Sequence, residues 1–315
     1  MRNRFVVAML VVAAAAVVAI LWLPGRWTAG HATSAQTRRT VDGKPDLNGI
    51  WQALNTANWD IQTHAARPAA VIQPGVYPDV PVPAAPVLAL GAVGGVPGGL
   101  GIVEGDEIPY QPWAAAKKKE NADHWLDRDP EIKCFFPGLP RAMYQPYPFQ
   151  IIQGTNKIQM VHEFANTGRT IHLDEVEPSP IDTWMGHSVG HWEGDTLVVD
   201  VKSFLDSTWF DRAGNFHSDA LHLVERFTPL TPDALAYEVT IEDPKVFTRP
   251  WKMSMPLYRR LEKNARLMEF RCTEFVEELM YGHLRKQPLV KHWEGETLSV
   301  DITRKIPPLD QMYER

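Results

Sequence analysis

The chain has 315 residues, of which 44% are hydrophobic and 22% are charged, and its formal net charge is −6. This composition is typical of a folded globular protein. The slightly negative charge and the lack of a lysine or arginine stripe argue against a nucleic acid as partner.

The N-terminus has the pattern of an export signal. Arg2 and Arg4 precede an uncharged apolar run from Phe5 to Leu23, and such a basic start keeps the N-terminus in the cytoplasm. The run just suffices to cross a bilayer as a helix. Residues 1–35 are therefore predicted to be either a cleaved signal peptide or a retained membrane anchor. Both alternatives predict a periplasmic or otherwise exported protein, either secreted or anchored.

Residues 36–315 are predicted to form a single β-rich domain. The Gly-x-Trp sequence from Gly49 to Trp51 resembles the entry strand of a lipocalin-type barrel. Residues 67–103 differ from the rest, because prolines, alanines and glycines are dense there. Proline at this density disfavours regular strands and helices. This segment is predicted to be a long apolar loop, either a lid or a poorly ordered insertion.

After this loop, the sequence predicts a helix and then a series of strands. The helix spans residues 112–125 with Pro112 at its first turn, and a second short helix is predicted at 274–286. The fold class is mainly β: an antiparallel hairpin meander that closes into a barrel or a curved sandwich, lipocalin-like in one alternative, with one or two short helices. The predicted strands span residues 149–153, 158–164, 170–173, 188–192, 196–201, 221–227, 235–241, 251–258 and 266–272.

A near-repeat shows which residues of the hairpins face the core. Residues 190–200 read GHWEGDTLVVD and residues 291–301 read KHWEGETLSVD, so eight of the eleven positions are identical. After the Glu-Gly turn, the second copy alternates apolar and polar residues, which is the pattern of a strand with one buried face. Transferred to the first copy, the alternation places three residues inside and Asp200 outside. The inward residues are predicted to be Leu197, Val199 and Val201.

The chain has two cysteines, Cys134 and Cys272. In an oxidising compartment an even pair predicts a disulfide. The alternative is two buried free thiols. Two cysteines so far apart in sequence do not make a zinc motif.

The loop at residues 211–222 holds the richest set of groups for acid–base chemistry. Asp211 could accept or orient a proton, and His217 belongs to the residue type that titrates near neutral pH. Both are candidate catalytic residues. The alternative is a polar loop whose side chains bind its own backbone.

Glu225 is a third catalytic candidate. In a strand at 221–227 it shares the more apolar face with Leu221, Leu223 and Phe227. Burial tends to raise the pKa of a carboxyl group, and such groups cluster at functional sites. The alternative is a structural ion pair, for example with Arg141 or Arg249.

Five further residues are candidates for substrate binding. Arg141 and Arg212 would stabilise an anion, while His222 adjoins the polar loop. Trp184 and Trp209 are either core residues or the lining of a pocket for an apolar small molecule.

Three other classes of site are disfavoured. Residues 186–190, GHSVG, match the serine-hydrolase nucleophile pattern but lead into a strand rather than a helix. No glycine-rich phosphate loop precedes a helix, so no cofactor is predicted. His187 and His191 would lie about 13–14 Å apart along one strand, too far to share a metal, and no metal site is predicted.

Several motifs together resemble a large family of uncharacterised exported bacterial proteins. They are DLNGIWQALNTANWD, GDEIPYQPW, PGLPRAM, PYPFQII, WEGDTLVVDV, TWFDRAGNFHSDALHLVERF and EVTIEDPKVFTRPWKMSMPLYRR. The resemblance covers nearly the whole mature chain and implies export and importance of residues 209–226, but no particular reaction. The chain departs from the family at His187, where an acidic residue is usual, so a catalytic role for His187 is in doubt. Residues 65–96 look like an insertion, which suggests that this loop is dispensable to the shared function.

These features predict an exported β-barrel protein that acts on, or binds, an apolar or aromatic small molecule. An enzyme of this kind would use cofactor-free acid–base chemistry, as a lyase, hydratase, isomerase or hydrolase, with His217 and Glu225 approaching each other in one pocket. The alternatives are a non-catalytic periplasmic carrier of a hydrophobic ligand and a structural envelope protein. The oligomeric state does not follow from the sequence.

Overall fold

The computed structural model describes most of the chain after residue 37. The described residues are 38–68, 72–74, 81–83, 95–174, 176–177, 179–272, 290–293 and 296–299. The predicted signal peptide or anchor and the predicted helix at 274–286 lie outside them. Within the described residues, no helix is long and apolar enough to cross a membrane.

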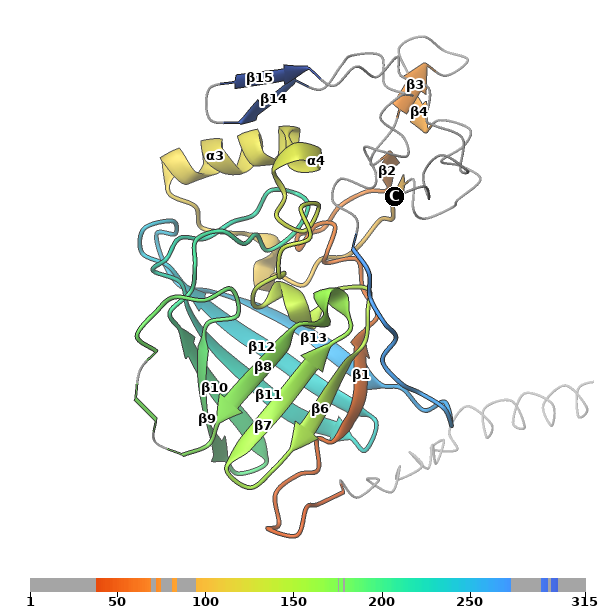
Figure 1. Ribbon diagram of the computed structural model, residues 1–315, viewed down its shortest axis with the longest axis vertical. Helices are drawn as coiled ribbons and strands as arrows, with labels where there is room; N and C mark the ends of the chain where they lie inside the picture. Colours follow the sequence, from red (N-terminus) through yellow and green to blue (C-terminus); the bar gives the residue numbers. More distant parts are fainter. Residues whose placement is uncertain are drawn as a thin grey trace, which may run out of the picture. The chain divides into compact units, whose positions relative to one another are not determined.

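In the described part of the chain, nine strands form one closed barrel (Figure 1). This confirms the mainly β fold and selects the barrel over the sandwich. The order around the barrel is β1-β13-β12-β11-β10-β9-β8-β7-β6, and β6 pairs with β1. The strands are β1 Gly49–Ala53, β6 Phe149–Gln153, β7 Lys157–His162, β8 Gly168–His172, β9 His187–Glu193, β10 Thr196–Lys202, β11 His222–Thr231, β12 Ala234–Glu242 and β13 Trp251–Arg259.

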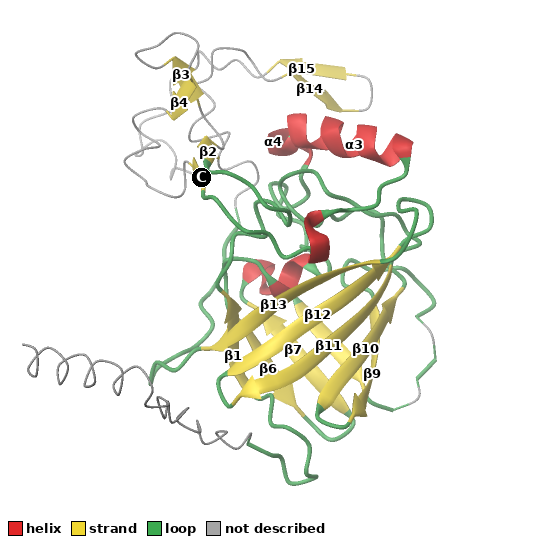
Figure 2. Cartoon of the chain, turned by 180° about the vertical axis from the view of Figure 1, so that it is seen from behind, coloured by secondary structure: helices red, strands yellow, loops and turns green. Residues whose placement is uncertain are grey.

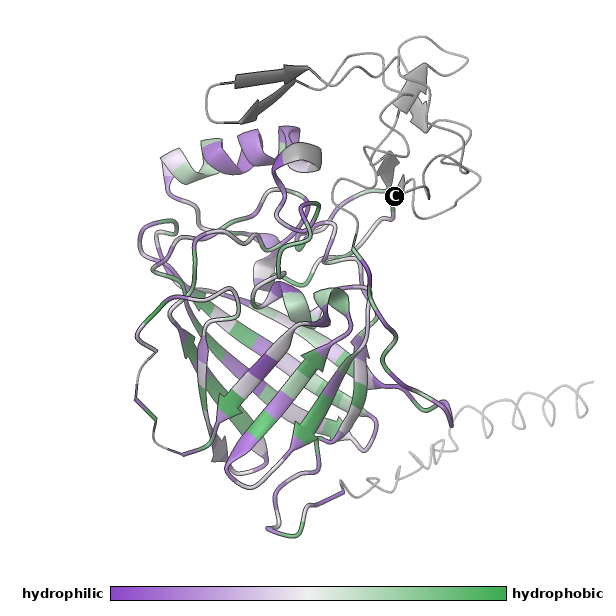
Figure 3. Ribbon diagram, in the orientation of Figure 1, coloured by the Kyte–Doolittle hydropathy of each residue, from purple (hydrophilic) through white to green (hydrophobic). Residues whose placement is uncertain are grey.

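Alternation of apolar and polar residues explains why these segments form a barrel. Along β13, residues alternate strictly between buried and exposed from Trp251 to Tyr258. The same pattern runs through the other long strands, so hydrophobic and hydrophilic positions alternate on the ribbon (Figure 3). Leu197, Val199 and Val201 are fully buried, as the near-repeat predicts, whereas the side chain of Asp200 is 46% exposed.

The strand order departs from a simple meander at one place. All neighbouring strands are antiparallel except β8 and β9, which run parallel and share a short register of Ile171 with Ser188 and His172 with Val189. The connection at 173–186 replaces a hairpin turn there. A lipocalin has eight strands in an up-and-down barrel, so the nine-stranded order is a different one.

Two local predictions need correction. Residues 266–272 do not form a strand. The physical reason is that β1 pairs with both β13 and β6, so the closed barrel offers no edge for another strand. Within residues 67–103, short strands do form in the described part: β2 Arg67–Pro68 pairs with β5 Gly95–Val96, and β3 Ile72–Pro74 pairs with β4 Pro81–Pro83.

Helices and loops cover the end of the barrel at which β1, β7, β10 and β12 end (Figure 2). We call this region the cap and define it as residues 54–66, 102–148, 203–221 and 243–250. The predicted helix is present as α3 Pro112–Asp123 and α4 Trp125–Arg128. The short 3-10 turns are η2 Glu104–Asp106 and η3 Arg141–Met143 in the cap, and η4 Phe164–Asn166 after β7.

The second copy of the near-repeat also forms a hairpin. Its strands are β14 Val290–Trp293 and β15 Glu296–Ser299, paired antiparallel in a sheet of their own among the described strands. The near-repeat therefore predicts strand pairing correctly in both copies, although only the first copy belongs to the barrel.

The predicted disulfide is confirmed. Cys134 and Cys272 are bonded, with their Cα atoms 5.7 Å apart and 138 positions apart in sequence. The bond joins the cap, just after α4, to the end of an irregular segment that follows β13. We call residues 260–272 the strap.

Candidate functional site

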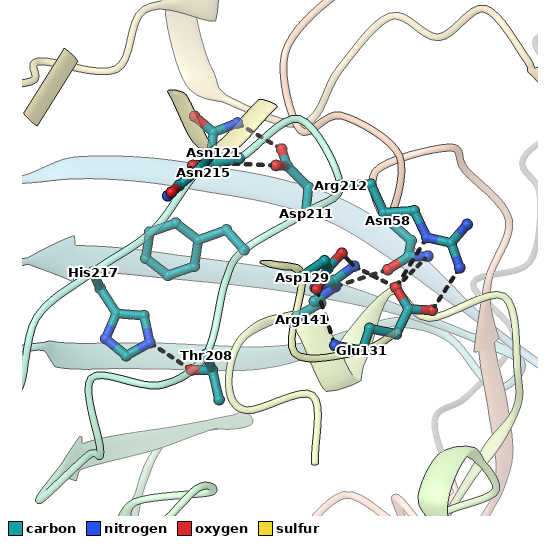
Figure 4. A network of polar contacts seen from close by, with 12 residues as sticks. Asn58, Asn121, Asp129, Glu131, Arg141, Thr208, Asp211, Arg212, Asn215 and His217 are labelled. Carbon is teal, nitrogen blue, oxygen red and sulfur yellow. Dashed lines mark hydrogen bonds and ion pairs between the residues drawn. The ribbon is translucent and has the colours of Figure 1, made fainter. Parts of the chain in front are cut away.

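The cap contains a buried ionic network centred on Arg141 (Figure 4). Its guanidinium donates to both carboxylate oxygens of Asp129 at 2.7 and 2.9 Å, and its Nε donates to Asn58 Oδ1 at 2.9 Å. It also pairs with Glu131, and all four side chains are buried. The hydrogen-bond donors of Arg141 are therefore used within the protein, in the arrangement of a structural ion network.

Arg212 extends this network to the loop at 211–217. Its Nε and Nη2 donate to Glu131 at 3.1 and 3.2 Å, and its guanidinium lies over the rings of Trp59 at 4.4 Å and Trp125 at 5.2 Å. Burial acts to raise the pKa of Glu131, but Arg212 and Arg141 outweigh it and the pKa is lowered. A charged Glu131 thus ties three cap segments together.

Asp211 holds two cap loops together from a fully buried position. Its oxygens accept hydrogen bonds from the backbone N–H of Ile61 at 2.9 Å and from Asn215, through the backbone N–H at 3.1 Å and the amide at 2.6 Å. Burial raises the pKa of Asp211 to about 7, the nearby Asp60 adds to the rise, and the three donors act against it. These contacts indicate a positioning role for this carboxyl group.

Titration of Asp211 predicts a pH-dependent stability. Its folded-state pKa lies above the value of about 3.9 in an unfolded chain, so protonation of Asp211 stabilises the fold in acid and this contribution is lost as the pH rises through about 7. Between pH 5 and pH 8, we expect the wild type to lose on the order of 2 kcal/mol more unfolding free energy than Asp211→Asn, measured by urea denaturation. The exposed Asp206→Asn should behave like the wild type, and an equal loss in all three proteins would contradict the prediction.

His217 is buried beside Thr208. Thr208 Oγ1 and His217 Nε2 are 2.5 Å apart, and His217 Nδ1 is 2.8 Å from the carbonyl oxygen of Ser218. The carbonyl can only accept, so Nδ1 donates and Nε2 accepts the hydroxyl proton. Burial lowers the pKa of His217, which favours this neutral form. Gly138 closes over the pair, because a Cβ there would lie 2.6 Å from Thr208 Oγ1.

Glu225 lies inside the barrel rather than in the cap. It forms a two-pronged ion pair with Arg169 of β8, and Tyr237 donates to its Oε1 at 2.8 Å. Arg169 Nε also donates to Ser188 of β9 at 2.9 Å, and the charged pair is fully enclosed. The inward position of Glu225 agrees with the sequence pattern, but its partner is Arg169 and not Arg141 or Arg249.

The predicted acid–base pair is therefore divided between two regions. His217 is bonded to Thr208 and Ser218, whereas Glu225 is bonded to Arg169 and Tyr237, and they share no hydrogen-bond partner among the described residues. Asp211, Arg141 and Arg212, by contrast, are brought together in the cap, as Figure 4 shows.

The remaining binding candidates are dispersed. His222 is on the outer face of the barrel, with Nε2 2.6 Å from Asp200 and Nδ1 3.1 Å from Glu242. Trp184 packs its ring 5.0 Å from that of Phe135. Trp209 is half-buried against the core. The structure does not assemble these three residues into one site.

A cleft lies where the strap passes the outer wall of the barrel. Its volume is about 300 Å³. Four apolar residues form part of its wall: Ile50 of β1, Pro148, and Ala265 and Met268 of the strap. The rest of the lining is polar or charged and consists of Glu163, Arg260, Glu262, Asn264 and Arg266. Next to these residues in sequence, three aromatic rings cluster with centroids 4.7 to 5.8 Å apart. They are Tyr147, Phe164 and Phe270.

The strap is fixed at both ends of the cleft. At one end, the Arg260 backbone N–H donates to Ile50 at 2.8 Å and the Arg260 guanidinium donates to Gln52 at 3.0 Å. At the other end, the Met268 N–H donates to the buried carboxylate of Glu163 at 2.7 Å, and the disulfide follows. These contacts hold the strap beside the barrel wall and so maintain the cleft between them.

Sequence patterns did not identify the residues of this cleft. Its walls come from β1, from the residues just before β6 and just after β7, and from the segment after β13, and an irregular strap has no period. The one signal that could have found it is Cys272, because a disulfide to Cys134 requires the chain to return from the end of β13 to the cap.

Among the described residues, no group of three or more His, Cys, Asp or Glu side chains is arranged to hold a metal ion.

Comparisons of the chain with protein-family models, with curated proteins and with solved structures found no match. The family resemblance that the motifs indicate stays a prediction.

Proposed function

We propose that the protein is an exported β-barrel protein that binds a small apolar or aromatic molecule in the cleft under the strap. The observation that carries the proposal is the cleft itself. Its volume of about 300 Å³ is at the lower end of the range of small-molecule sites, and it combines an apolar part of the wall, formed by Ile50, Pro148, Ala265 and Met268, with charged and amide side chains that could orient a ligand. Phe270 of the strap packs against Tyr147 and Phe164 and so helps to hold the strap beside the barrel wall.

The state of the candidate catalytic groups favours binding over turnover. Asp211, His217 and Glu225 are each at most 2% exposed. Each is also bonded to protein partners, so a substrate would have to displace these bonds to reach them. A carrier needs only the cleft, and we therefore place the carrier ahead of an acid–base enzyme.

Two features support the exported location within this proposal. The basic and apolar N-terminal sequence is the pattern of an export signal. A disulfide persists in an oxidising compartment and is rare in the cytoplasm.

The neutral aromatic probe N-phenyl-1-naphthylamine tests the proposal, because its fluorescence rises in an apolar site. We expect saturable binding with a dissociation constant on the order of 100 μM or tighter. Ala265→Trp should fill the cleft and weaken binding about tenfold or more, because Ala265 lines the cleft.

The matched control is Ala116→Trp on the exposed face of α3, which adds the same ring away from the cleft. It should bind the probe as the wild type does. Absence of saturable binding, or equal binding by Ala265→Trp and the wild type, would reject the cleft as the ligand site.

A further inference from the structure

Two histidines from different strands meet on the outer wall of the barrel. His172 ends β8 and His187 begins β9, and the parallel pairing of these strands brings their rings to a centroid distance of 5.5 Å with 25° between the ring planes. Both side chains are half-buried. The contact exists only because β8 and β9 are parallel, since an antiparallel hairpin would place His187 at the other end of the strand.

These imidazoles are not used for other polar contacts in the described structure. Among the described residues, no hydrogen bond or ion pair involves the ring of His172 or His187, whereas the rings of His191, His217 and His222 all have such partners. The Nε2 atom of His187 is buried and has no partner there. A buried ring nitrogen without a partner is a free ligand atom.

We propose that His172 and His187 bind a divalent transition-metal ion of the class that imidazole favours, with Zn²⁺ and Cu²⁺ as its members to be tested. When two imidazoles share a tetrahedral ion at about 2.0–2.1 Å from each nitrogen, their ring centroids lie roughly 5 Å apart. The observed centroid distance of 5.5 Å is close to this value. Both side chains are partly exposed, so water would complete the coordination of the ion.

Protonation and neighbouring charge set the strength of this site. Burial, together with His172, lowers the pKa of His187, and imidazole binds a metal in its neutral form. Lys157 and Lys202 lie opposite the two histidines in the neighbouring strands, and Lys202 is paired with Asp200 at 3.1 Å. The lysines oppose a cation, so the ion is exchangeable rather than permanently held.

A bound ion would join β8 to β9 where the barrel has its shortest register. Two residue pairs define this register, against seven for β9 with β10. Because the ion binds the folded barrel and loses one of its two ligands when the strands separate, it stabilises the barrel by mass action. The site thereby makes stability of the barrel depend on metal concentration.

Calorimetric titration of the chain, prepared without a polyhistidine tag, tests this proposal. We expect one equivalent of Zn²⁺ per chain, and at least about tenfold weaker binding by His172→Asn and by His187→Asn. His191→Asn, on the same strand and bonded to Glu193, is the matched control and should bind as the wild type does. Cu²⁺ should give a visible absorption band that both variants lose, and Mg²⁺ should not bind.

Thermal unfolding gives a second readout. Zn²⁺ should raise the unfolding midpoint of the wild type and of His191→Asn, but not of the other two variants, whose midpoints without metal show that they are folded. No binding of Zn²⁺ or Cu²⁺ by the wild type would overturn the proposal. Binding that survives in both His172→Asn and His187→Asn would equally overturn it, because the ion would then be elsewhere.

Discussion

Replacing Glu225 with glutamine should lower the free energy of unfolding by about 3–5 kcal/mol. The change preserves the shape of the side chain but removes its charge. The guanidinium of Arg169 then stays charged, without its counterion, at a fully buried position inside the barrel. A buried charge without its counterion is costly, because the surroundings cannot replace the lost hydration. Urea denaturation at pH 7 measures the effect as a lower midpoint at unchanged slope.

Two further proteins make this test specific. The double variant Arg169→Met/Glu225→Leu removes both charges, and it should recover much of the lost stability, since apolar residues of similar volume often replace a buried pair well. Glu193→Gln breaks the exposed pair with Arg226 and should cost less than about 1 kcal/mol. A loss below about 1 kcal/mol for Glu225→Gln, or a double variant less stable than it, would contradict this account.

Removing the disulfide should have an effect of similar size. The bond closes a loop between positions 138 apart, and in the chain-entropy model such a loop corresponds to about 4–5 kcal/mol of stability. We expect the double variant Cys134→Ser/Cys272→Ser to unfold at a lower urea concentration by that amount. Reduction of the wild type should produce the same shift, because it removes the same constraint from the unfolded chain.

Mass spectrometry without reductant supplies the control for this prediction. The unreduced wild type should be lighter than the reduced form by two hydrogen atoms and should not react with a thiol-labelling reagent. Labelling of both cysteines in the native protein, or equal stability of the double variant and the oxidised wild type, would refute it.

The strands of the barrel could be predicted where apolar and polar residues alternate within a single strand. Alternation at 197–201 predicts the inward face of β10, and alternation at 221–227 predicts that Glu225 faces the core. These assignments depend only on neighbouring residues in one strand. The strand predicted at 266–272 is wrong because barrel closure, a property of all nine strands together, leaves it no edge.

The contacts between distant segments could not be predicted in the same way. Arg169 reaches Glu225 across 56 sequence positions, and the pairing depends on the parallel contact of β8 with β9, which no local pattern reports. His172 and His187 meet for the same reason. The cleft is assembled from the barrel wall and an irregular strap, so its residues carry no shared period and no common motif.

A parallel contact such as that between β8 and β9 is also required by the number of strands in the barrel. In a closed barrel whose neighbouring strands are all antiparallel, the two strand directions must alternate around the barrel. The number of strands must therefore be even. Nine strands cannot satisfy this, and one like-directed contact is therefore compulsory. Its location decides where two consecutive strands cannot be joined by a hairpin turn, which here is between His172 and His187. That segment cannot be shortened to a tight turn without reversing β9, because a turn joins only oppositely directed strands. The connection between β8 and β9 must therefore be longer than a tight turn because the number of strands in the barrel is odd.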